Sequence, residues 1–231
     1  PSIHTLKLNR LNHAGIASLS ESILGQAGRD NDIVNLLQRE IEGNPFFVVE
    51  VVRALAEREG LDKIDVITIP RRIFAGGIQE VVQRRLSRVP EHTQPLLQLV
   101  AIGGRQLDLA VLAEMNSDIV IDDWLALCSD AAVLEIQNEQ WRFAHDKLRE
   151  QVLDDLLDDK RSTAHRQVAE AIETVYPDDA GQAATLAYLW GVVGDDDKEL
   201  QYSALAGQQA LQNSANHEAV HFLTRAIELL G

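Results

Sequence analysis

The sequence predicts a mainly α protein with a small β-hairpin, arranged as a helical bundle, a second helical domain and a set of helical hairpins. Three observations predict this class. The 231 residues include only 14 glycines and 6 prolines, while good helix formers such as alanine and leucine are common. Apolar residues recur at helical spacing through most of the chain. Patterns typical of strands are confined to short stretches, so we do not expect a large sheet.

Composition also bounds the compartment and the partners. Cys128 is the only cysteine, which excludes an internal disulfide framework and suits a reducing cytosol. No apolar run approaches the ~20 residues of a membrane span, so we expect a cytoplasmic protein without a membrane partner. The net charge is −15, and residues 108–231 alone carry 24 acidic and 8 basic groups. This acidic half argues against non-specific binding to nucleic acid or to anionic membranes.

Residues 1–59 predict a short strand followed by a small helical bundle. Residues 3–8 have β character and suit the last strand of a sheet. A first helix follows over residues 16–24, and Gly25 lets it end. A second helix, with apolar residues at helical spacing, begins after Asp30.

A corner at residues 43–47 (GNPFF) joins this second helix to a third. Gly43 can end a helix in a left-handed conformation. Asn44 can cap the next helix, and Pro45 fits its first turn, where no backbone N–H is needed. Local rules therefore predict a helical hairpin with a proline at its corner.

Residues 60–77 form a predicted connector, and residues 78–159 a second domain. Helical patterns in this domain lie at residues 81–86, 90–101, 109–112 and about 118–131. Two strand patterns then flank a turn-forming stretch at 137–140 (QNEQ). The last three of these helices, followed by a β-hairpin, have the order of elements in a winged helix.

Residues 160–231 are predicted to be helical throughout and to end in a tetratricopeptide-like (TPR-like) helical hairpin. Gly207, Ala219 and Ala226 have the spacing of the small residues in such a repeat. Small residues at these sites let paired helices approach closely. Gly194 and Asp195 are similar to the turn of a preceding, weaker repeat.

The corner segment resembles a known family. Residues 43–47, followed by Glu50, Arg53 and Leu55, resemble the "GNPFF-x-x-E-x-x-R-x-L" segment of STAND-type ATPases. These are AAA-like signal-transduction switches found in large LuxR-type transcriptional regulators and beside nucleotide cyclases or kinases. The resemblance implies that residues 1–59 are the end of a nucleotide-binding domain and its helical lid. It also implies that Pro45, with Asn44 beside it, lies near bound adenine.

A second segment strengthens this resemblance. Residues 141–150 (WRFAHDKLRE) resemble the "F-x-H-D/A-x-L-R-E" segment that ends the winged-helix domain in the same ATPases. The resemblance implies that His145 follows the last strand of the wing and reaches the β-phosphate of ADP in the inactive state. An imidazole N–H can donate to phosphate. The alternative from pattern alone is a histidine that caps or packs at a strand-to-helix corner.

The resemblance implies cofactors and partners that this chain would share with a preceding domain. ATP or ADP with Mg²⁺ would be bound by an N-terminal P-loop domain and closed over by Pro45 and His145. A protein or small-molecule signal at the helical repeats would release the winged helix, permit nucleotide exchange and drive homo-oligomerisation. Pro1 is not an initiator methionine, so we expect a piece of a longer protein, although removal of a methionine or tag gives the same start.

Hydrolysis of ATP by this chain alone is not expected. A P-loop has the pattern G-x-x-x-x-G-K-[ST], and no glycine here is followed by lysine. Residues 119–123 (IVIDD) imitate the Mg²⁺-binding strand of such ATPases, but they lie where the winged helix needs a helix start, with Ser117 or Asp118 as its cap. The longer parent protein would be the ATPase.

A zinc peptidase is the second enzyme class to consider, because His217, Glu218 and His221 form an H-E-x-x-H sequence. Such a site needs a third ligand. The ten residues after His221 contain no histidine or aspartate, and Glu228 is too near on the same helix. We therefore reject a metal site here.

Direct DNA binding is also rejected. The third helix of a winged helix often reads DNA. Here it carries Asp118, Asp122, Asp123 and Asp130 without lysine or arginine, and four carboxylates would repel phosphates. The net-basic residues 61–107 can face either phosphates or solvent.

Two functions remain as predictions from the sequence. The first is the regulatory C-terminal part of a STAND-type ATPase switch. The alternative is a protein-binding helical scaffold without a nucleotide. A P-loop in the gene sequence upstream of Pro1 would favour the first.

Overall fold

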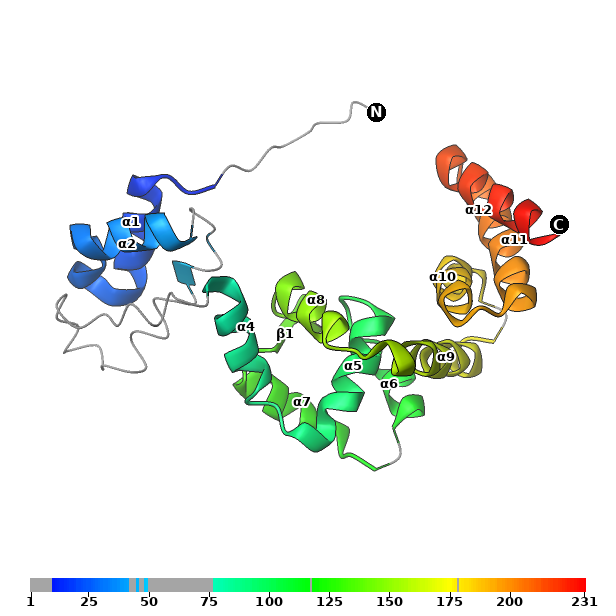
Figure 1. The fold of residues 1–231 in the computed structure, drawn as a ribbon, viewed down its shortest axis with the longest axis horizontal. Helices are drawn as coiled ribbons and strands as arrows, with labels where there is room; N and C mark the ends of the chain where they lie inside the picture. Colours follow the sequence, from blue (N-terminus) through cyan, green and yellow to red (C-terminus); the bar gives the residue numbers. More distant parts are fainter. Residues whose placement is uncertain (1–9, 42–44, 46–47, 50–76, 117, 178) are drawn as a thin grey trace. The chain divides into compact units, whose positions relative to one another are not determined.

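The computed structural model describes residues 10–41, 45, 48–49, 77–116, 118–177 and 179–231 (Figure 1). It confirms the predicted class: the chain is mainly helical, and the sheet in these residues is a two-stranded antiparallel hairpin. The chain divides into two compact units, residues 1–84 and residues 85–231. Each unit is described by itself below. In the part of the chain that the structure describes, no helix is long and apolar enough to cross a membrane.

The first unit contains two of the three helices that its apolar periodicity predicts, α1 (His13–Leu24) and α2 (Asn31–Ile41), joined by the 3-10 helix η1 (Gly25–Arg29). The side chain of Asn12 caps α1, and Gly25 ends it at a φ of 64°. Asp30 precedes α2 and accepts a hydrogen bond from the Asp32 backbone N–H at 2.8 Å. The fully buried apolar side chains described here are those of Ile16, Ile33, Val34, Leu37 and Val48.

Glycine is required at position 28 by close packing rather than by backbone conformation. A Cβ atom at this position would lie 2.3 Å from the backbone carbonyl of Ser20. Only glycine therefore allows η1 to pack against the backbone of α1. The predicted strand at residues 3–8, Asn44 and most of the predicted helix after the corner lie outside the described residues, as do residues 60–76 of the connector.

The helices and strands of the predicted second domain follow the expected order. They are α4 (Gly77–Leu86), η4 (Glu91–Thr93), α5 (Gln94–Gly103), α6 (Leu109–Met115), α7 (Ile121–Asp130), β1 (Leu134–Gln137), β2 (Gln140–Phe143) and α8 (Asp146–Asp154). The imitation of a Mg²⁺-binding strand at residues 119–123 is indeed a helix start, because Asp122 and Asp123 lie in the first turn of α7. The predicted cap is different: Val120 precedes α7 and provides no side-chain cap.

The hairpin turns at Asn138 and Glu139, which both adopt positive φ, at 51° and 62°. Two consecutive residues with positive φ are typical of the two-residue turn that joins the strands of a β-hairpin. A third segment extends this small sheet on the other edge of β2. Leu107 donates its backbone N–H to the Trp141 carbonyl at 2.8 Å, and Phe143 donates to the Arg105 carbonyl at 3.0 Å. The sequence pattern did not predict this pairing.

The C-terminal part consists of α9 (Asp158–Val175), η5 (Ala180–Gln182), α10 (Ala183–Val193), α11 (Asp196–Gln212) and α12 (Asn216–Leu229). From α9 to α12, each helix packs against the next (Figure 1). Gly194 ends α10 in the left-handed conformation, and Asp195 caps α11. Ala219 and Ala226 are buried, which confirms their predicted packing role.

One hydrophobic core joins the hairpin-containing part to the helical hairpins. Buried side chains of α5 and α6 share this core with those of α9 and α10, among them Leu99, Val111, Ile172 and Trp190. The core therefore continues across residue 160, where the sequence suggested a domain boundary. Helix α9 is its central element, because it contacts α5, α6 and α10.

Candidate functional site

The corner between β2 and α8 is the first candidate site, and His145 lies at its centre. His145 has an extended backbone and caps α8: its Nδ1 atom accepts the backbone N–H of Lys147 at 3.1 Å. A neutral imidazole has one donor and one acceptor nitrogen. Because Nδ1 is the acceptor, the proton of the neutral ring lies on Nε2. The capping role that pattern alone suggested for this histidine is therefore present in the structure.

The surroundings of His145 favour the neutral ring. Burial is the largest cause that lowers its pKa below the usual value; the Asp146 carboxylate opposes the shift and the Arg105 guanidinium adds to it. The N-terminus of α8 also disfavours a positive charge at its cap. Protonation would turn Nδ1 into a donor and remove the cap. At neutral pH the ring thus presents an N–H donor without a positive charge.

Arg105 brings a permanent cation to the same corner. Its Nε and Nη1 atoms contact the two carboxylate oxygens of Asp146 at 3.2 and 3.3 Å. The carbonyl of Arg105 accepts the backbone N–H of Phe143, so the Arg105 backbone is fixed to strand β2 of the hairpin. Sequence analysis did not connect Arg105 to this site. No local pattern marks it, because the pairing of residues 105–107 with β2 joins positions far apart in the sequence.

The remaining residues of the 141–150 segment hold α8 in place. Leu148 is fully buried. Arg149 donates its Nε–H to the Ala101 carbonyl in the last turn of α5 at 2.7 Å. Lys147 and Glu150 form an ion pair on the exposed face. Most residues of this segment therefore have a structural role, and His145 combines a capping Nδ1 acceptor with an Nε2–H donor.

The lid residues are only partly within the described structure. Pro45 has a helical backbone and an exposed side chain, and Asn44 lies outside the described residues. Pro45 belongs to the first unit and His145 to the second. A shared nucleotide site formed by these residues remains a prediction.

The H-E-x-x-H sequence lies on α12. His217, Glu218 and His221 are exposed, while Ala219 on the same helix is buried. The His221 ring contacts the Phe222 ring edge-on, with 5.2 Å between centroids. Among the residues that the structure describes, no group of three or more histidine, cysteine, aspartate or glutamate side chains is placed to hold a metal ion.

A groove along α10, α11 and α12 is the second candidate site, and sequence analysis did not find it. It has a volume of about 440 Å³ and is bordered by Tyr188 and Phe222. Tyr188 is 64 % exposed, which is unusual for a large aromatic side chain. The Glu199 carboxylate, on a residue only 7 % exposed, accepts two hydrogen bonds from Arg225 at 2.6 and 3.0 Å.

Gly191 makes room for this buried carboxylate. A Cβ atom at Gly191 would lie 3.0 Å from the carboxyl carbon of Glu199. Because two charges in the groove are paired with each other, their desolvation is offset and the groove keeps a defined shape. Such a concave surface with an exposed aromatic side chain suits a peptide or a flat apolar ligand.

Comparison with models of known protein families, with curated proteins and with solved structures finds no match to this chain. Support for a function therefore comes from the residues of the chain and from their geometry.

Proposed function

We propose that this chain is the regulatory C-terminal part of a STAND-type ATPase switch. In this proposal a preceding P-loop domain holds ATP or ADP with Mg²⁺. The lid around Pro45 and a winged helix around His145 respond to the nucleotide state. The helical hairpins bind a protein or small-molecule signal, and nucleotide exchange drives homo-oligomerisation in the cytoplasm.

The observation that carries the proposal is the state of His145. Residues 43–55 and 141–150 resemble two segments of that family, and the second resemblance implies a histidine that donates to phosphate. The Nδ1 cap assigns the proton of the neutral ring to Nε2, and the Arg105 guanidinium lies close enough to lower the pKa of the ring. A neutral N–H donor beside an arginine suits a nucleotide phosphate, because both groups favour an anion.

Helix α9 supports the part of the proposal that concerns signal transfer. It packs against α5 and α6 on the hairpin side and against α10 on the repeat side. A signal that shifts α10 to α12 would therefore act on the core that also positions the hairpin and α8. The groove beside Tyr188 is the surface proposed to receive that signal.

The test uses the longer protein that contains the P-loop domain, loaded with a fluorescent ADP analogue. The two variants are His145→Ala and His145→Ser. Serine is a good helix cap, whereas alanine is not, and neither side chain reaches as far as an imidazole. We expect both variants to release ADP about tenfold faster, because each loses one hydrogen bond to a charged group. Unchanged release from the serine variant would leave His145 with a capping role only.

The second candidate function, a protein-binding scaffold without a nucleotide, is favoured by the groove itself. Its aromatic border and paired charges need no nucleotide domain to act. The gene sequence upstream of Pro1 discriminates between the two, because the switch requires a G-x-x-x-x-G-K-[ST] loop there. The 231 residues alone should bind ATP weakly or not at all. Micromolar binding in a calorimetric titration would contradict the proposal that the preceding P-loop domain binds the nucleotide.

A further inference from the structure

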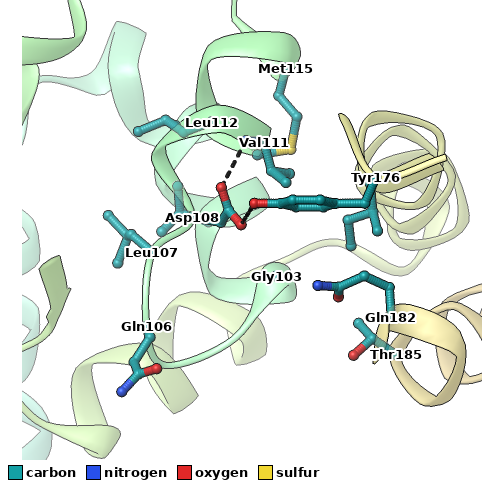
Figure 2. A pocket seen from close by; sticks show the side chains of 12 residues that line it. Gly103, Gln106, Leu107, Asp108, Val111, Leu112, Met115, Tyr176, Gln182 and Thr185 are labelled. Carbon is teal, nitrogen blue, oxygen red and sulfur yellow. Dashed lines mark hydrogen bonds between the residues drawn. The ribbon is translucent and has the colours of Figure 1, made fainter. Parts of the chain in front are cut away.

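A pocket lies where the hairpin-containing part meets the helical hairpins, and all of its walls belong to the second unit (Figure 2). Its cavity volume is about 80 Å³, well below that of drug-sized sites, so that any ligand must be small. Helices α5 and α6 form one wall, and the end of α9, η5 and the start of α10 form the other. The apolar lining consists of Val100, Leu107, Val111, Leu112, Met115 and Ile172.

The polar side chains of the described residues that line this pocket include one negative charge and no positive charge. Besides the apolar side chains and Gly103, it is lined by Gln106, Asp108, Tyr176, Gln182 and Thr185. One of these is a carboxylate, and none is lysine, arginine or histidine. Because this carboxylate is the one charged group in the described lining, an anionic ligand would be disfavoured relative to a neutral or cationic one.

Asp108 is held in a fixed orientation at the edge of the pocket. Its Oδ1 atom caps α6 by accepting the backbone N–H groups of Ala110 and Val111 at 2.9 and 3.2 Å. Its Oδ2 atom accepts the hydroxyl of Tyr176, whose ring reaches across from the end of α9 (Figure 2). A carboxylate offers about four acceptor positions. Three are used here, so one remains for a ligand donor.

We propose that this pocket binds a small molecule with an apolar body of about one ring and a hydroxyl or ammonium group that donates to Asp108. The apolar lining accommodates the ring, Asp108 selects the donor, and Gln182 and Thr185 border the opening. This site goes beyond the proposed function and does not depend on a nucleotide. It lies between the two elements that Tyr176 and Asp108 connect, namely the end of α9 and the start of α6.

The chain carries its own reporter for this test, because Met115 is its only methionine and lines the pocket. Protein labelled with ¹³C at the methionine methyl group gives one signal from inside the site. The probes are benzylamine, benzyl alcohol and benzoate, which share a phenyl body and differ in charge. We expect benzylamine and benzyl alcohol to shift the Met115 signal at about 20 mM or below. Benzoate should shift it at least about tenfold more weakly.

Three variants separate binding in the pocket from a general effect. Thr185→Phe should fill the pocket and abolish the shift, whereas Thr174→Phe, the same change on the exposed face of α9, should leave it intact. Asp108→Asn keeps a good helix cap but removes the charge. It should weaken benzylamine about tenfold and leave benzyl alcohol within about twofold.

Several results would overturn the proposal. These are a Met115 signal that no probe moves at about 20 mM, equal shifts by benzoate and benzylamine, or shifts that persist in Thr185→Phe. If Thr185→Phe fails to fold, the ratio of benzylamine to benzyl alcohol affinity in Asp108→Asn decides the question. An unchanged ratio would show that Asp108 does not select the ligand. None of these results bears on ADP release by the longer protein.

Discussion

The packing of α11 against α12 gives the sharpest test of the helical hairpin, through the substitution Gly207→Ala. A Cβ atom at this position would lie 2.6 Å from Leu223 Cγ, 2.7 Å from its Cδ2 and 3.3 Å from its backbone nitrogen. Carbon atoms normally approach to about 3.5–4.0 Å. The Cγ atom is not the flexible end of the leucine, and the backbone nitrogen is also close. The substitution must therefore move the side chain of Leu223 and displace α12.

Two effects of opposite sign decide the magnitude. Overpacking a well-packed interface costs about 1–3 kcal/mol. Replacement of glycine by alanine inside a helix contributes about 0.5–1 kcal/mol of stability in the other direction. We therefore expect Gly207→Ala to lower the free energy of unfolding by about 1 kcal/mol.

A second substitution removes the cause of the clash. In a Leu223→Ala background the same change at residue 207 should stabilise the protein, so that the sign of its effect reverses. The coupling free energy between the two sites should be about 2 kcal/mol.

The assay is urea unfolding followed by tryptophan fluorescence. All three tryptophans, Trp124, Trp141 and Trp190, belong to the second unit, so the signal reports that unit alone. Gly103→Ala is the matched control, because a Cβ atom there meets its nearest neighbour at 4.0 Å and should be tolerated. The close helix approach would be refuted if Gly207→Ala stabilised the protein in the wild-type background.

Two further predictions concern titratable groups of the second unit. Burial lowers the pKa of His145, so the unfolded chain takes up a proton at higher pH than the folded protein. The capping contribution should therefore be full above the usual histidine pKa of about 6.5 and decline as pH falls toward the folded value. Urea titrations at about pH 7.5 and about pH 5.5 should show a smaller pH-dependent loss in His145→Ser than in wild type, and equal losses would exclude the cap as their origin. Burial also raises the pKa of Cys128 to about 12, so its thiol should resist iodoacetamide in the folded protein and react once urea unfolds it. Fast modification of the native protein would contradict the buried position of Cys128.

Much of the fold could be predicted from local patterns. The apolar periodicity of α1 and α2, the glycine after α10 and the turn at residues 137–140 are each set by residues within a few positions of one another. The structure confirms these elements. The start of α7 was placed three residues early, because Asp118 looked like a cap, whereas Val120 is still extended and the helix begins at Ile121.

The candidate site could be predicted only in part. The position of His145 between a strand and a helix follows from the local pattern, and the structure confirms that it caps α8. The role of Arg105 could not be predicted, since its segment pairs with β2 about forty residues later. Strand pairing over such a distance has no local signal, because it depends on how α6 and α7 return the chain to the same place.

The sequence by itself determined that the chain is mainly helical, which helices carry small residues, and that a histidine follows the hairpin. These features depend on backbone preferences and on side chains a few positions apart. Only the tertiary structure decided the contacts between Tyr176 and Asp108, 68 residues apart, and between Arg225 and Glu199, 26 residues apart. The physical reason is that the stacking of α9 to α12 on α5 and α6 is set by the volumes of a shared core, and every side chain in that core contributes to it at once.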